Sequence, residues 1–585
     1  MSHTRMLTLI ATVAVASTSL AACSGGGSNG SGPASGRGAH GATNVSAGGT
    51  LQYQTNTPRE TLDPQRDYTA EGIAMEHALF SRGLVAFPTS TGTKSASTPV
   101  PDLATTTGTS TDGAKAWSFT LRAGVKWQDG SPVTCADVKY GTARVFATDV
   151  ITGGPTYMLS YLNIPEITSG PRKGLPIYDG PYKKDGQSSF DKAVTCVGKT
   201  ITYHFNKSWP DFPLYLAAMG AGDPYKQSQD HGAKSNYQVF SDGPYKLQGA
   251  WQQGQGGSFV RNPQWSAKSD PVRKALPNKI VFQEGVTPEL GAQQLIADSG
   301  TSQDVVTTNN IPPATFSQIT GSAAQRAVNV QAPFVEYLIP NMLRLKNPKV
   351  RQALAMALDK TSYIQAGGGS KMYDPAYSIV NPNVPGYRKN SAFSTIPAGG
   401  DPAAAKKLLQ QAGVTLPYPI TLTYRTNGPT SDKQFGAIAA AWDQAGFKVT
   451  LDGLTSTYWT AIAQPHGTWD VAWSDWAPAW PSMSTELPPL FDSRQNLTPT
   501  TTGADNGSYQ SKQVNALFDQ AAAVTSLQKQ IPIYQKAETV LGRDVAYIPL
   551  AIQKFYRISG SNVTGPVASP ATFMYPDLAG IGVKQ

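Results

Sequence analysis

The chain has 585 residues, of which 40% are apolar and 15% charged, and its formal net charge is +9. This length accommodates several domains, and the apolar fraction excludes an intrinsically disordered chain. The excess of lysine and arginine is scattered rather than gathered in a block, so nucleic-acid binding is not expected.

The N-terminal segment has the pattern of a lipoprotein signal peptide. Arg5 precedes a moderately apolar stretch, and Leu20-Ala21-Ala22-Cys23 resembles the bacterial lipobox. We expect residues 1–22 to be removed and Cys23 to carry a lipid. An ordinary secretory peptide is the alternative, because it also ends in small residues. No second apolar run is long enough to span a bilayer, so the mature protein is expected to be lipid-anchored on the extracytoplasmic face of the cell membrane.

A tether and the first folded residues follow. Residues 23–48 are rich in Ser and Gly and are predicted to form a flexible linker. Folding is expected to begin near Gly49-Thr50-Leu51. From there, period-two and helical apolar patterns alternate along the chain, which indicates a mixed α and β fold.

The next region contains a hairpin and a capped helix. Trp117 to Leu121 alternates with period two, and the pair Asp129-Gly130 predicts a tight turn. Thr134, with Asp137 three residues later, is expected to cap a helix. A further strand is predicted at Ile201, Tyr203 and Phe205.

Three cysteines are present in the sequence. With Cys23 assigned to the lipid, Cys135 and Cys196 remain as a pair in an oxidising compartment, where a disulfide is the expected state. Two independent buried thiols are the alternative.

Three helices are predicted farther along the chain. Asn347-Pro348 and Asp401-Pro402 each place proline at the first position of a helix. The second of these helices is expected to end at Gly413, and Ser511 is expected to cap a third.

A search for catalytic patterns finds little. The five histidines after the signal segment include no pair at helical spacing, so a zinc site is unsupported. Gly198-Lys199-Thr200 lacks the upstream glycine of a phosphate-binding loop, because position 193 is Ala. We expect no enzyme activity, no metal and no cofactor.

Tryptophans gather between Asp470 and Ser482. Large rigid rings beside irregular backbone suit ligand contact, so Trp476 and Trp480 are candidate binding residues. A buried aromatic corner of the core would give the same composition.

Several blocks, in order, resemble the extracytoplasmic solute-binding proteins, family 5, of peptide/nickel-type ABC importers. They are Gly49–Leu51 with Leu62–Pro64, Trp117–Val138, Asp242–Leu247 with Arg261–Pro263, Val350–Leu354 with Leu358–Lys360, Asp401–Gly413, and Val545–Leu550.

This resemblance implies an α/β fold, a two-lobed clamshell of the type II binding-protein kind with an additional N-terminal domain. Lobe I would comprise residues 49–80, 190–335 and 549–585, the additional domain residues 81–189, and lobe II residues 336–548. The implied partners are an oligopeptide or peptide-like small ligand and the permease subunits of an ABC transporter. We expect a monomer.

The resemblance also indicates which sequence position would bind the amino group of a peptide ligand. In peptide-binding relatives, the element D-x5-W is followed three residues later by an aspartate that pairs with the free α-amino group. Here Asp470 and Trp476 match that element, but Ala479 stands at the acid position. Asp475 lies four residues away, about 13 Å along a strand, too far to replace the acid without a register change. Free peptide N-termini are therefore not the expected ligand group.

Two further residues are weaker candidates for ligand contact, and several alternative functions remain open. Tyr424 and Arg425, expected in a loop after a strand, are further possible ligand contacts. The same fold could bind a non-peptide solute, such as an oligosaccharide or a metal complex, or serve as a sensor of peptide signals. A secreted hydrolase is the alternative from a different functional class.

Overall fold

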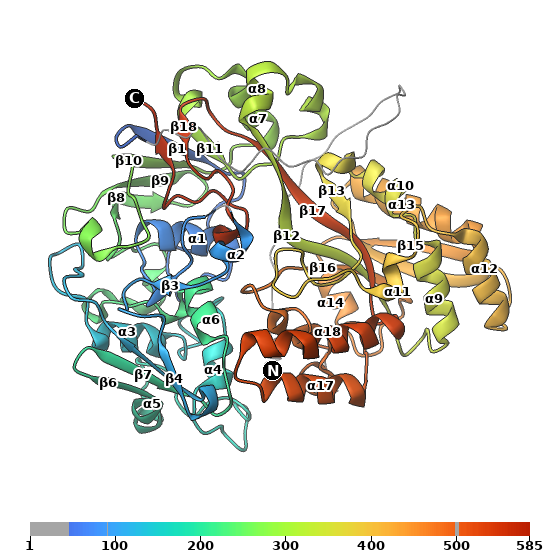
Figure 1. Cartoon of the computed structure of the whole chain (residues 1–585), viewed down its shortest axis with the longest axis horizontal. Helices are drawn as coiled ribbons and strands as arrows, with labels where there is room; N and C mark the ends of the chain where they lie inside the picture. Colours follow the sequence, from blue (N-terminus) through green and yellow to red (C-terminus); the bar gives the residue numbers. More distant parts are fainter. Residues whose placement is uncertain (1–45, 91, 498–501) are drawn as a thin grey trace. The chain divides into compact units, whose positions relative to one another are not determined.

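A computed structural model describes residues 46–90, 92–497 and 502–585. They form two compact units. Unit 1 comprises Gln331–Phe555, and unit 2 comprises residues up to Val330 together with Tyr556–Gln585. The chain passes from unit 2 to unit 1 within β12 (Ala327–Pro340) and returns within β17 (Ile548–Ile558) (Figure 1).

Unit 1 is built on a six-stranded mixed sheet. Its strand order is β13-β17-β12-β16-β14-β15. β14 runs parallel to β15 and β16, whereas β12 is antiparallel to β16. The strands not yet located are β13 (Tyr373–Pro375), β14 (Tyr418–Arg425), β15 (Phe447–Leu454) and β16 (Val471–Trp476).

Helices surround this sheet, and all three predicted helices are present. Asn347 and Ser511 accept hydrogen bonds from the first turns of their helices, and Asp401 Oδ1 accepts one from Ala404 N at 2.8 Å. Gly413 follows its helix at a φ of +70°, as a C-terminal glycine should. The helices are α9 (Pro348–Ala357), α10 (Lys360–Ala366), α11 (Ser391–Ser394), α12 (Pro402–Gln411), α13 (Pro429–Gln444), α14 (Tyr458–Ile462), α15 (Pro488–Phe491), α16 (Ser493–Asn496), α17 (Lys512–Ala522) and α18 (Leu527–Arg543).

The core of unit 1 lies between its sheet and its helices. Trp442 is fully buried there and donates through Nε1 to the carbonyl of Leu354 at 3.0 Å, which links α13 to α9. α9 packs on α12, and α17 on α18.

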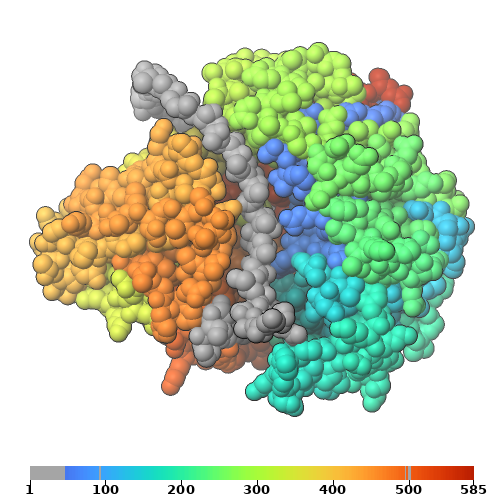
Figure 2. Space-filling view, turned by 180° about the vertical axis from the view of Figure 1, so that it is seen from behind, coloured from blue at the N-terminus to red at the C-terminus, as the bar shows by residue number. Residues whose placement is uncertain are grey.

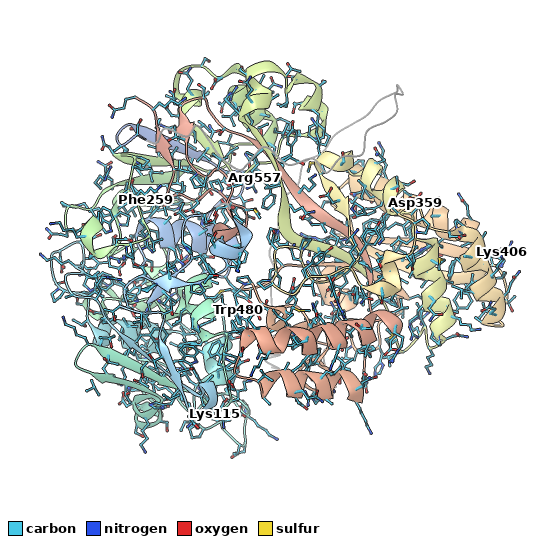
Figure 3. All side chains as sticks on the ribbon, in the orientation of Figure 1. Lys115, Phe259, Asp359, Lys406, Trp480 and Arg557 are labelled. Atoms are coloured by element: carbon cyan, nitrogen blue, oxygen red, sulfur yellow. A yellow bond between two sulfur atoms is a disulfide. The ribbon has the colours of Figure 1, made fainter. Side chains whose placement is uncertain are left out.

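Figure 2 shows the surface of unit 1 from behind, where its yellow and orange segments gather. Asp359 and Lys406, labelled in Figure 3, lie at the start of α10 and on α12.

Unit 2 contains a five-stranded sheet of order β11-β1-β10-β9-β8. β1 (Thr50–Gln54) begins at the predicted start of the fold and pairs in parallel with its two neighbours. Residues from the C-terminal segment, including Val563, Ile581 and Val583, are buried in the same core as Leu51. The other strands are β8 (Tyr245–Gln252), β9 (Gly256–Arg261), β10 (Lys279–Gln283) and β11 (Val305–Thr307).

A second sheet of unit 2 is antiparallel, with the order β4-β5-β7-β6. It contains the strands predicted at Trp117 and Ile201, and a boundary between residues 189 and 190 would separate β5 from its partner β7. The division of the chain into lobe I, an additional N-terminal domain and lobe II stays a prediction. The strands are β4 (Thr109–Thr111), β5 (Ala116–Thr120), β6 (Val194–Val197) and β7 (Thr200–His204).

The predicted hairpin and capped helix of unit 2 are confirmed. Trp127 N donates to the carbonyl of Ser131 at 2.8 Å across the turn. Thr134 and Asp137 form a reciprocal capping box at the start of α3 (Cys135–Arg144). The remaining elements of unit 2 are β2 (Val85–Ala86), β3 (Val100–Pro101), β18 (Val563–Thr564), β19 (Gly582–Val583), α1 (Ala70–Leu79), α2 (Thr93–Ala96), α4 (Tyr157–Tyr161), α5 (Gln187–Ala193), α6 (Phe212–Ala218), α7 (Pro288–Ala297) and α8 (Gly321–Arg326).

Candidate functional site

The aromatic segment predicted to contact ligand is the end of β16 and the loop after it. The loop is folded back on the strand: Trp476 Nε1 donates to the carbonyl of Thr485 at 2.9 Å, and Thr485 Oγ1 donates to the carbonyl of Trp480 at 3.1 Å. Trp480, labelled in Figure 3, is only 3% exposed. The Trp476 ring and the Trp480 carbonyl are therefore both bonded to Thr485.

Trp476 and Ala479 are both partly exposed, so this loop presents an aromatic ring and a methyl group rather than a carboxylate. The side chain of Ala479 carries no negative charge to pair with an ammonium group. The roles of Trp476, Trp480 and Ala479 as ligand contacts stay predictions.

Tyr424 and Arg425 are placed differently from the expectation. They are the last two residues of β14, not part of a loop, because pairing with β15 continues to Arg425 opposite Leu454. Tyr424 is 5% exposed and stacks on Phe435 with ring centroids 4.2 Å apart. Its hydroxyl donates to Asp432 Oδ1 at 2.8 Å, so Tyr424 packs in the core of unit 1.

Asp475 lies directly opposite Glu336 in the pairing of β16 with β12. Directly paired residues of an antiparallel sheet share one face, so the two carboxyl groups are neighbours. Both are buried, with exposed fractions of 8% for Asp475 and 3% for Glu336. Sequence reasoning did not select Glu336, although a single acid inside the apolar run from Phe334 to Ile339 could have pointed to it.

The two acids have different surroundings. Glu336 accepts a hydrogen bond from Tyr363 at 2.7 Å on one oxygen and from Gln553 at 2.8 Å on the other. The Asp475 carboxylate lies near its own backbone N–H and near the charge of Arg425. Burial raises the pKa of Glu336 to about 7 and that of Asp475 to about 6, although the charge of Arg425 opposes the rise at Asp475.

Two enclosed side-chain donors belong to the same part of unit 1. Trp473 interacts with Glu336, and Gln434 interacts with Tyr373. Trp473 lies two residues from Asp475 on β16, so both side chains point to the same face of the sheet. This part of unit 1 is thus buried, polar and aromatic.

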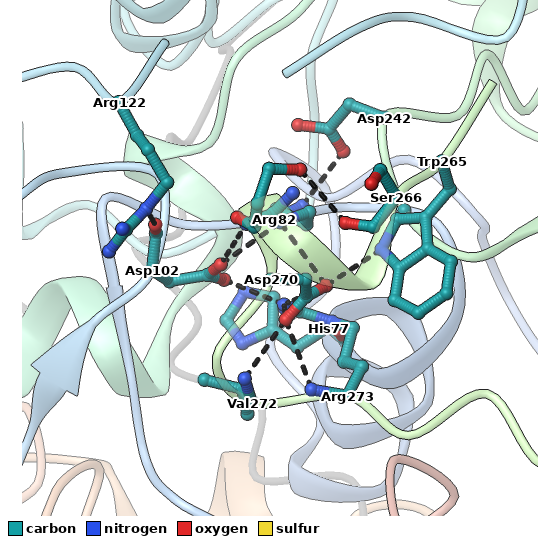
Figure 4. A network of polar contacts seen from close by, with 12 residues as sticks. His77, Arg82, Asp102, Arg122, Asp242, Trp265, Ser266, Asp270, Val272 and Arg273 are labelled. Carbon is teal, nitrogen blue, oxygen red and sulfur yellow. Dashed lines mark hydrogen bonds and ion pairs between the residues drawn. The ribbon is translucent and has the colours of Figure 1, made fainter. Parts of the chain in front are cut away.

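Unit 2 contains a buried ion network of a different kind (Figure 4). Arg82 and Arg273 donate to the two oxygens of Asp102 at 2.6 and 2.7 Å, and Arg82 N donates to Asp242 at 3.0 Å. These groups are almost completely enclosed. Asp242 is the first residue of the block Asp242–Leu247 described above. Its bond to Arg82 N means that this block helps to hold the interior of unit 2 together.

The predicted disulfide is present between Cys135 and Cys196, whose Cα atoms are 6.0 Å apart. It joins the start of α3 to β6. Cys23 lies outside the described residues. Within the described ranges, no helix has the length and apolar character needed to cross a membrane, and no group of three or more His, Cys, Asp or Glu side chains is placed to hold a metal ion.

Comparison with known families identifies the fold. Residues 98–498 match the model of the bacterial extracellular solute-binding proteins, family 5. The chain belongs to this family. As a family 5 solute-binding protein it acts outside the cytoplasm and belongs to a class of binding proteins rather than enzymes, and the resemblance inferred from the sequence blocks is confirmed.

Individual relatives agree with this assignment. The chain is 24% identical over 485 residues to the glutathione-binding protein GsiB of Salmonella paratyphi A, covering 80% of this chain and 84% of GsiB. It is 24% identical over 462 residues to the periplasmic oligopeptide-binding protein OppA of Haemophilus influenzae, covering 74% and 77%. The structure of clavulanic acid biosynthesis oligopeptide binding protein 2 is similar with a TM-score of 0.82 and 25% identity, covering 94% and 99%. The α/β fold class of the two-lobed binding proteins is thereby confirmed.

Proposed function

We propose that this family 5 solute-binding protein captures an oligopeptide-class ligand outside the membrane and delivers it to the permease of an ABC importer. The observation that carries the proposal is the family match over residues 98–498, together with relatives named for binding glutathione and oligopeptides. No covalent step is required, because delivery needs only binding and release.

Ala479 narrows the ligand class. An ammonium group buried beside a methyl group and an aromatic ring would lack a counter-charge, which costs several kcal/mol. We therefore propose that the loop after β16 does not receive a free peptide N-terminus. Peptides with a blocked or distant amino group fit this loop better, and their backbone can be recognised by main-chain hydrogen bonds.

We also propose that Cys23 carries the lipid and that the protein works as a tethered monomer. A lipid holds the binding units near the membrane, where a weak interaction with the permease suffices. Intact mass of the protein extracted from membranes tests this: a diacylated Cys23 at the new N-terminus supports it, and a chain released by a Cys23→Ala substitution is the control.

Native mass spectrometry of the gently purified protein tests the ligand class. A retained peptide or peptide-like mass, released on denaturation, supports the proposal. A retained sugar oligomer or metal complex would contradict it. Turnover of chromogenic esters, together with no retained mass, would favour the hydrolase instead.

A further inference from the structure

The two cysteines of the disulfide in unit 2 differ in their access to solvent. Cys135 is 5% exposed, whereas Cys196 is exposed and is followed by Val197, which is 78% exposed. Cys196 lies on β6, the last strand in the order β4-β5-β7-β6, and no further strand pairs beyond it in the described part of the chain. A buried disulfide is protected from thiols, whereas an exposed one is open to exchange. A reagent in the solvent therefore meets Cys196 first.

Cys135 has the surroundings of a leaving group. It is the first residue of the helix α3, whose N-cap is Thr134. The positive end of the helix dipole favours a thiolate at this position. Asp137, the acidic residue of the first turn, is already engaged, because its Oδ2 accepts hydrogen bonds from Thr134 N and Oγ1, both at 2.8 Å. Cys196 lies on a strand and has no comparable dipole beside it.

The structure around the disulfide has other supports. β6 pairs with β7 along its whole length, from Val194 opposite Tyr203 to Val197 opposite Thr200. Val194 and Tyr203 are completely buried, and α3 packs on both strands. Opening the disulfide lowers the stability of this region but leaves these contacts in place, so exchange can proceed in the folded protein.

We propose that the Cys135–Cys196 disulfide is a modification site at which the folded protein exchanges with small-molecule thiols outside the cytoplasm. The sulfur of a small thiolate attacks Sγ of Cys196 and forms a new disulfide with it. The bond between Cys196 and Cys135 breaks, and its electron pair leaves on Sγ of Cys135 as a thiolate. One disulfide and one thiolate are consumed and one of each is formed, so the step needs no oxidant or reductant. The proposal does not depend on which ligand the protein carries.

The position of the adduct in the wild-type chain tests the proposal. The full chain is incubated without denaturant at pH 8 with mercaptoethanol, a small monothiol, and is quenched early with excess iodoacetamide. Peptide mass spectrometry then locates both labels and distinguishes them from any label on Cys23. We expect the mercaptoethanol adduct on Cys196 and the alkyl group on Cys135, in at least about tenfold excess over the reverse product.

Two results of this experiment would overturn the proposal. One is the reverse product in equal or greater amount, with the adduct on Cys135. The other is a disulfide that stays intact under these conditions and reacts only after urea is added, because exchange would then require unfolding.

Two single variants test the unequal access directly. Cys135→Ser leaves Cys196 as a thiol, and Cys196→Ser leaves Cys135. With dithiobis(nitrobenzoate), a bulky aromatic disulfide, the Cys196 thiol should react at least about tenfold faster than the Cys135 thiol. The variant that lacks both cysteines supplies the background from Cys23. Equal rates in two variants shown by circular dichroism to be folded would overturn the proposal, and if either variant is unfolded, the product ratio of the wild-type chain decides.

Discussion

Glu336 and Asp475 face each other across neighbouring antiparallel strands, 139 residues apart in the sequence. Such a pair places two carboxyl groups in the interior of unit 1, where both pKa values rise because the charged forms are poorly solvated. The pair makes the stability of unit 1 depend on pH.

Glu336 should make unit 1 less stable at neutral than at mildly acidic pH. Its pKa is about 7 in the folded chain, above the ordinary value of 4.5, so the folded state binds more protons than the unfolded state. The contribution is fully present below about pH 4.5 and is lost as pH rises through about 7, a change of at most about 3 kcal/mol. Urea unfolding followed by circular dichroism measures it.

Glu336→Gln is the comparison for that experiment. The amide keeps an acceptor for Tyr363 but does not titrate, so the fall in stability between pH 4.5 and 7.5 should become smaller. An unchanged pH dependence in this variant would show that Glu336 is not the group responsible.

Restoring an acid at Ala479 should create the amine site of peptide-binding relatives. Ala479→Asp is expected to improve binding of free-amino tripeptides relative to their acetylated forms by about tenfold, because a charge-assisted hydrogen bond is gained. Calorimetric titration measures the ratio. Ala477→Asp places the same charge two residues earlier in the loop and should not reproduce the gain; if it does, general electrostatics rather than position is responsible.

The disulfide should stabilise the antiparallel sheet of unit 2. It closes a loop with a sequence separation of 61, for which the chain-entropy relation gives about 4 kcal/mol. A Cys135→Ser/Cys196→Ser double variant should therefore unfold at a markedly lower urea concentration. Reduced wild-type protein should behave like the variant, and a wild-type midpoint that does not respond to reductant would contradict the prediction.

The cap of α12 offers a local test. Asp401→Ala removes the acceptor for Ala404 N and should lower the free energy of unfolding by about 1 kcal/mol. Asp401→Asn keeps an acceptor oxygen and should cost much less. Equal losses in both variants would mean that the carboxylate charge, not the capping hydrogen bond, stabilises the helix.

Local features of this fold were predictable because their causes lie within a few residues. The capping pair Thr134 and Asp137, the Asn347 and Asp401 caps and the strand at Trp117 all follow from neighbouring positions. The disulfide followed from counting cysteines in an oxidising compartment.

Features that depend on distant pairing were not predictable in the same way. Tyr424 looked like a loop residue because nothing nearby in the sequence shows that β15 continues alongside it as far as Leu454. Glu336 was missed because its importance comes from Asp475, Tyr363 and Gln553, which reach it only through the sheet and α10. The sequence located the aromatic loop after β16, but not the acid pair beside it.

The C-terminal residues Val563, Ile581 and Val583 share a core with Leu51, which lies near the start of the folded chain. Synthesis must therefore be complete before this core can close. A chain that lacks these last residues would leave Leu51 and the first strand of unit 2 without part of their packing.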